Sequence, residues 1–178
     1  MSYRRLFIFL EGPDDIRFFE NVIIPMIKDD YDDIKPINYK SYKNRKKIYV
    51  INLIKSIKSI PAHYLFVTDI NDSPCITHKK NEQYRIYNSV LDSEKTVVVV
   101  QEIESWYYAG LENTKCTELK IPVLRTTDNM QKEDFERLKP KEYTHLTFMR
   151  EILSCYSTDC AVNKNTSFNY FIRKHIVT

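Results

Sequence analysis

Three continuous apolar runs stand out in the first part of the chain, at residues 4–10, 63–69 and 95–100. Unbroken apolar runs of this length, without an alternation of apolar and polar positions, predict strands buried on both faces of a parallel sheet. A weaker strand signal lies near residues 35–40. The pattern therefore predicts four strands, most of them in the interior of a sheet.

Segments of helical spacing separate these runs. After the first run, apolar residues at Ile16, Phe19, Ile23 and Ile27 predict a helix that Pro25 should kink or end. A second stripe, formed by isoleucines at positions 48, 51, 54 and 57, predicts an amphipathic helix, and a mostly polar helix is expected over residues 77–90. This strand–helix rhythm is typical of a doubly wound α/β domain with a mostly parallel four-stranded sheet flanked by helices.

Beyond residue 112 the pattern becomes helical, with helices expected over 131–139, 144–155 and 166–176. We therefore expect an α/β core over residues 1–112 and a helical extension over 113–178 that packs on the core. The final third of the chain is interpreted as two amphipathic helices joined by a polar turn. An exposed apolar stripe on them would form a homodimer or partner surface.

The composition, with 43% apolar and 29% charged residues over 178 positions, is that of a soluble globular protein. No apolar stretch approaches the roughly 20 residues of a membrane span, and the N-terminal apolar run is too short for a signal peptide, so a cytoplasmic location without membrane contact is expected. The net charge is only +3, but residues 39–47 carry five basic side chains and two tyrosines. Such a segment indicates either phosphate binding or a solvated helix face.

Each of the three strong apolar runs ends in acids. Glu11 follows the first run, Asp69 and Asp72 follow the next, and Glu102 and Glu104 follow the last. Since ligands bind at the carboxyl ends of strands in open parallel sheets, these carboxylates would converge at one edge. Oxygen ligands without nearby His or Cys favour Mg²⁺ or Mn²⁺. The alternative is that the acids end the strands only because loops are polar.

The sequence also resembles a known family. "FLEGPDDIRFF", at residues 9–19, is similar to the opening motif of Toprim domains, the catalytic module of topoisomerases, primases and overcoming-lysogenisation-defect nucleases. "FVTDIND", at residues 66–72, stands where that family carries a D-x-D motif, and "VVVVQEIESWYYAGL" resembles a segment of small standalone Toprim-like proteins in antiphage defence. The resemblance implies a Rossmann-like Toprim fold and Mg²⁺-dependent cleavage of DNA or RNA, with an ATPase partner in the same chain or in a separate subunit.

The resemblance carries over residue by residue. Glu11 matches the family glutamate, a general acid/base or metal ligand, and Asp69 matches the first aspartate of D-x-D. The second aspartate falls on Asn71, and Asp72 follows it. Either Asp72 replaces the missing carboxylate, or a second metal ion binds weakly, or catalysis has been lost. The expected catalytic residues are Glu11, Asp69 and Asp72, and the expected metal ligands are these three with Asn71, Glu102 and Glu104.

Two other functions compete with a metal-dependent endonuclease. A non-catalytic Toprim-like module would bind nucleic acid or a partner protein, in keeping with Asn71. A receiver-like domain would accept a phosphoryl group on Asp69, with Asp14 and Asp15 as its paired acids. Trp106 could stack on a base, but an aromatic residue just after a strand is more often part of the core. For Glu104, the alternative to a metal role is a place in the first turn of a helix.

Overall fold

A computed structural model describes residues 3–41 and 46–176 of the chain, so the predicted basic segment at 39–47 lies partly outside the described residues. The chain divides into two compact units, Met1–Val98 and Val99–Thr178. The first is an α/β unit and the second is helical. A boundary after residue 112, and the packing of a helical extension on the core, stay predictions.

The first unit is built on a parallel sheet with the strand order β2-β1-β3-β4. The strands span β1 (Arg5–Leu10), β2 (Asp33–Asn38), β3 (Ala62–Asp69) and β4 (Thr96–Val99). In register, Arg5 of β1 lies opposite Asp33 on one side and Ala62 on the other. The predicted α/β class and the four-stranded, parallel, helix-flanked sheet are confirmed. The chain leaves β1 toward β2 and then crosses to β3, so the order reverses between β1 and β3.

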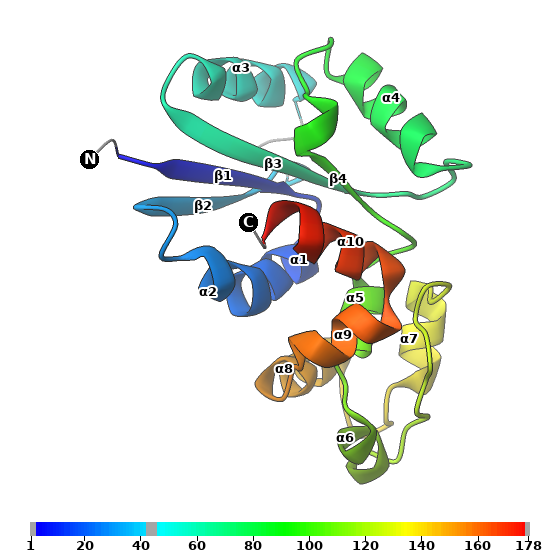
Figure 1. The fold of residues 1–178 in the computed structure, drawn as a ribbon. Helices are drawn as coiled ribbons and strands as arrows, with labels where there is room; N and C mark the ends of the chain where they lie inside the picture. The colour runs from blue at the N-terminus through cyan, green and yellow to red at the C-terminus, as the bar shows by residue number, and fades with distance from the viewer. Residues whose placement is uncertain (1–2, 42–45, 177–178) are drawn as a thin grey trace. The chain divides into compact units, whose positions relative to one another are not determined.

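Helices cover both faces of this sheet (Figure 1). The helices α3 (Lys47–Lys58) and α4 (Ile76–Ile86) lie on one face, and α1 (Pro13–Phe18) and α2 (Ile24–Ile27) lie on the other. The core beneath α3 and α4 consists of buried aliphatic and aromatic side chains from the strands, the helices and the turns that follow them: Phe9, Tyr39, Val50, Ile51, Ile54, Ile57, Tyr64, Phe66, Tyr87, Val90 and Leu91. Burial on both faces explains why the strand sequences show no alternation.

Two details of the predicted helices differ from the structure. The helical segment continues past Pro25 to Ile27, with a π-helical turn at Phe19–Ile23 between α1 and α2. A π-turn shifts the hydrogen-bond ladder by one residue, which accommodates a proline that has no N–H to donate. The predicted stripe of α3 was wrong at Ile48, which is 56% exposed, while Val50 is buried. Ile48 lies in the first turn, where the helix has only begun to pack on the sheet.

The second unit contains six helices in the described residues: α5 (Ile103–Ala109), α6 (Asn113–Glu118), α7 (Lys132–Leu138), α8 (His145–Ser154), α9 (Thr158–Lys164) and α10 (Thr166–His175). All residues of α5 are buried, and this helix contacts α7, α8 and α9. Trp106 is fully buried, its indole N–H donates to Ser167 Oγ at 2.8 Å, and its ring packs on Phe168 and Phe171. The core interpretation of Trp106 is confirmed, and its ring is not available for stacking on a base.

The polar turn expected between the last two helices was wrong, because α9 occupies most of that segment. Ser157 caps this helix by accepting from the N–H of Cys160, yet Ala161 is its only buried residue. One small apolar side chain leaves no periodic signal in the sequence. Among the helices of the described residues, none combines the length and the apolar composition that a membrane crossing requires.

Candidate functional site at the carboxyl edge of the sheet

The candidate site is centred on Glu11, the first residue after β1. In the sheet, β1 lies between β2 and β3, and all three strands run in the same direction. The carboxyl ends of β1 and β3 flank the point where the strand order reverses, which is where ligands bind in open α/β sheets. The fold therefore places Glu11 and the end of β3 at the usual ligand-binding position.

One oxygen of Glu11 accepts three hydrogen bonds. Thr68 donates its hydroxyl to Glu11 Oε1 at 2.7 Å, the Tyr39 hydroxyl donates at 2.9 Å, and the backbone N–H of Asp69 donates at 3.2 Å. Two donors come from the last residues of β3 and one from the residue after β2. The backbone N–H of Tyr39 also donates to the carbonyl of Leu10 at 3.0 Å, which extends the pairing of β1 with β2 and holds Tyr39 beside Glu11.

The other oxygen of Glu11 has a cation beside it. Lys40 Nζ forms an ion pair with Glu11 Oε2, and only 11% of the Glu11 side chain is exposed, against 54% for Lys40. The glutamate is thus fixed by its surroundings, while the lysine reaches it from solvent. Such a carboxylate is held in one orientation, with a positively charged partner on its second oxygen.

The tyrosines around Glu11 stay protonated. Burial raises the pKa of Tyr39 well above its usual value, and the Glu11 carboxylate raises it further. The same two causes, burial first, raise the pKa of Tyr87 to about 12. A neutral phenol can donate to Glu11, whereas a phenolate would repel it, so Tyr39 remains a hydrogen-bond donor at neutral pH.

The predicted ligands after β3 are arranged in a turn. Asp69 ends β3, and its backbone N–H lies against the Glu11 carboxylate; the convergence of the two carboxylates stays a prediction. Asn71 and Asp72 are exposed. Asn71 has a φ of +46°, and its side-chain amide donates to the carbonyl of Asp69 at 3.1 Å. Asparagine tolerates this left-handed conformation better than most residues, so the shape of the turn explains why an asparagine occupies position 71.

The remaining predicted ligands lie in the second unit. Glu102 is the N-cap residue of α5, and its Oε2 accepts from the backbone N–H of Lys132 at 2.6 Å. Glu104 lies in the first turn of α5, is 4% exposed, and has Lys132 Nζ at 3.8 Å from its Oε1. Burial raises the pKa of the Glu104 carboxyl, and the Lys132 charge opposes this shift.

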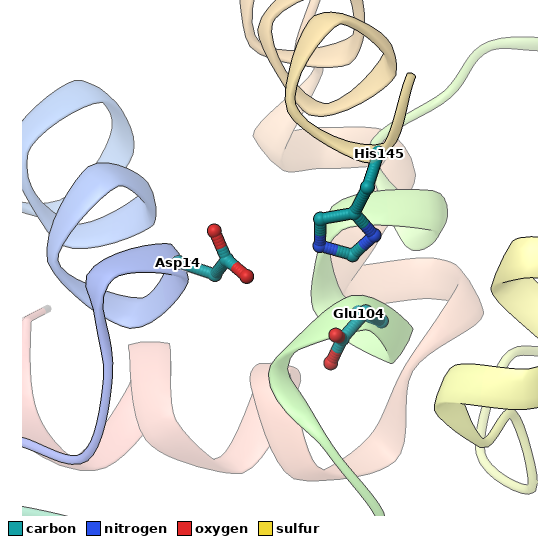
Figure 2. Close-up of side chains that lie close together, drawn as sticks. All are labelled: Asp14, Glu104 and His145. Carbon is teal, nitrogen blue, oxygen red and sulfur yellow. The ribbon is translucent and has the colours of Figure 1, made fainter. Parts of the chain in front are cut away.

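Glu104 has a histidine beside it that the sequence did not suggest. A carboxylate oxygen of Glu104 and a ring nitrogen of His145 lie within 4.8 Å of each other, and both side chains point into the same space in Figure 2. The imidazole Nδ1 also contacts Glu136 Oε1. Each of the two groups could offer one ligand atom to a metal ion, whose identity their chemistry leaves open.

Asp14, the third residue drawn in Figure 2, belongs to the first unit. It lies in the first turn of α1 and forms an ion pair with Arg17, one turn along the helix. His145 stands 41 positions after Glu104 (145 − 104). No local spacing connects the two, so only the packing of α8 with α5 brings them together.

Comparison with protein-family models, with curated proteins and with solved structures finds no match to this chain.

Proposed function

We propose that this protein is a metal-dependent nuclease that cleaves phosphodiester bonds of nucleic acid, with Glu11 and Asp69 at its centre. The observation that carries the proposal is the position of Glu11: a carboxylate held against the end of the neighbouring strand, at the switch point of a parallel sheet. The resemblance of "FLEGPDD" and "FVTDIND" to Toprim motifs supports the same assignment.

In this proposal the chain's own residues prepare a negatively charged, oriented site. Tyr39, Thr68 and the backbone of Asp69 hold one oxygen of Glu11, which leaves Oε2 as the oxygen that faces a cation. A bound Mg²⁺ or Mn²⁺ would activate water and neutralise charge on the phosphate. Glu11 and Asp69 would hold the ion, with Asp72 supplying the further carboxylate. An ATPase partner, a homodimer and a role in antiphage defence belong to the proposal through the resemblance alone.

A non-catalytic module that binds nucleic acid is the second candidate, and the same glutamate favours it. Four donors already satisfy Glu11, one of them the ammonium group of Lys40, and Asn71 stands in place of an acid. A glutamate in this state needs no metal to compensate its charge. The two candidates therefore differ in whether a divalent ion takes the place of Lys40.

Cleavage assays separate the two functions. The purified full chain is incubated with plasmid DNA or RNA in Mg²⁺ or Mn²⁺, beside Glu11→Gln, Asp69→Asn and a control, Glu20→Gln, at an exposed acid of the same unit. The nuclease predicts cleavage by the wild type and the control, lost in the two site variants. Retention of nucleic acid without cutting in either metal would establish the binding module instead.

A further inference from the structure

The opposite edge of the sheet carries a pocket that the proposed function does not use. It has a volume of about 210 Å³ and is lined by residues that precede or begin β1 and β3: Tyr3, Arg4, Arg5, Ile60, Pro61, Ala62 and His63. Arg5 and Ala62 are register partners, so the pocket lies at the amino ends of the two central strands. Because the strands are parallel, this is the edge away from Glu11, and the pocket stands independently of the proposed nuclease site.

Two arginines dominate the charge of this pocket. The guanidinium carbon of Arg4 lies 5.2 Å from the centre of the Tyr31 ring, and that of Arg5 lies 4.9 Å from the centre of the Tyr3 ring. A guanidinium group stacked on a tyrosine keeps its N–H edge available for hydrogen bonds. The aromatic rings thus hold the two cations in place without neutralising them.

No carboxylate within the described residues forms an ion pair with either arginine side chain. The nearest acid by contact is Asp32, and its carboxylate accepts from the backbone N–H of Arg4 at 2.6 Å. Asp33, the register partner of Arg5, forms its ion pair with Lys35. Two positive side chains beside one pocket, neither of them in an ion pair within the described residues, leave a place for a negatively charged ligand.

His63 adds a neutral group to the pocket. Burial, followed by the charges of Lys95 and Arg4, lowers the pKa of His63, so its imidazole is uncharged at neutral pH. Its Nδ1 lies 3.3 Å from the hydroxyl of Tyr31, the same residue that stacks under Arg4.

The size and charge of the pocket limit the class of ligand. Pockets for drug-sized molecules measure about 300–1,000 Å³, so a pocket of about 210 Å³ suits a smaller group. Guanidinium groups match phosphate oxygens in a two-pronged geometry. We propose that this pocket binds a phosphate group, either as free inorganic phosphate or as the phosphate of a small monoester, with Arg4 and Arg5 as its main ligands.

Amide chemical shifts of the full, isotope-labelled chain test the proposal. Inorganic phosphate is titrated at constant ionic strength, and sodium chloride is titrated alone as a comparison. The expected result is a saturable shift of the amides of residues 3–5, 60, 62 and 63. Thymidine 5′-monophosphate, titrated in parallel, distinguishes the sources: equal affinity for both probes indicates recognition of the phosphate alone, and tighter binding of the monoester indicates an ester as the ligand.

Substitutions at the two exposed arginines complete the test. Arg4→Gln/Arg5→Gln is expected to weaken phosphate binding at least about tenfold, because it removes two charged donors. Arg85→Gln, at an exposed arginine on α4, is the matched control and should bind as the wild type does. The proposal is overturned if neither probe gives a saturable shift, if chloride reproduces the shifts, or if the double variant binds phosphate as tightly as the control.

Discussion

Lys40 is predicted to compete with a divalent ion for Glu11. Its ammonium group lies on Glu11 Oε2, the oxygen that no other donor contacts in the described residues. A metal ion binding there must displace the lysine, since both cannot occupy one position on the carboxylate. We therefore expect Lys40→Met, which keeps a long apolar stem and removes the charge, to bind Mn²⁺ more tightly than the wild type does.

The expected change in the Mn²⁺ dissociation constant follows from how exposed the Lys40–Glu11 ion pair is. Lys40 is 54% exposed, and ion pairs of exposed side chains contribute about 0.2–1 kcal/mol to stability. The buried side of Glu11 places this pair near the upper end of that range. Losing a competitor worth about 1 kcal/mol improves the dissociation constant about fivefold. Calorimetric titration of Mn²⁺ into the full-length protein resolves a change of this size.

Two variants make this result specific to Lys40. Lys40→Arg keeps the positive charge and should leave the dissociation constant near that of the wild type. Lys35→Met removes a lysine that pairs with Asp33 on β2 and should also have no effect. Mn²⁺ binding that is unchanged or weaker in Lys40→Met would refute the competition. No measurable Mn²⁺ binding by any variant would remove the metal site itself.

Three further predictions concern stability and its dependence on pH. Gly110→Ala should destabilise the protein by about 3 kcal/mol in urea unfolding, because the added Cβ would lie 2.1 Å from a carbon of the Tyr156 ring. Tyr39→Phe removes one of three donors to Glu11 Oε1 and should lower the free energy of unfolding by about 1–2 kcal/mol. Burial raises the pKa of Glu104, so its contribution to stability falls as pH rises above its ordinary pKa of 4.5; Glu104→Gln should gain stability relative to the wild type as the pH rises above that value.

Matched substitutions show what would contradict these results. Gly12→Ala places a Cβ 3.3 Å from Asp15 Oδ2, at an ordinary extended φ of −143°, and should cost much less than Gly110→Ala. Tyr84→Phe, at a tyrosine that is 47% exposed, should be neutral. Glu20→Gln, at an exposed acid of the first unit, is the control for Glu104→Gln. If each site variant behaves like its control, the crowding, the hydrogen bond and the burial invoked here are not the causes.

The strands could be predicted from the sequence because buried strands consist of continuous apolar residues. The valines of β4 and most of the apolar run of β1 are buried, although β4 is an edge strand, and each of these apolar runs corresponds to a strand. Where an element buries few side chains, the sequence shows no such apolar pattern. Helix α9 buries only Ala161, and the exposed Ile48 looks in sequence like the isoleucines that α3 does bury. The pattern of apolar residues along the sequence therefore predicts a strand or helix more reliably the more apolar surface that element buries.

The candidate site was predictable in part, and the limit has a geometric cause. Because β1 and β3 are parallel neighbours, their carboxyl ends lie at the same edge of the sheet, and the backbone of Asp69 reaches the Glu11 carboxylate. The pairing of Glu104 with His145 depends on how helices pack within the second unit, and no sequence spacing encodes it. The same holds for the indole of Trp106, whose N–H finds Ser167 far along the chain.

The strand order explains why so many hydrogen-bond donors reach Glu11. Because β1 lies between β2 and β3, a residue just after β1 has the end of a strand on each side. Tyr39 and Lys40 reach Glu11 from the β2 side, and Thr68 and Asp69 reach it from the β3 side. A glutamate after an edge strand would have donors on one side only. The sequence alone predicts the acids but not this order, and the order determines which side chains reach Glu11 from each side.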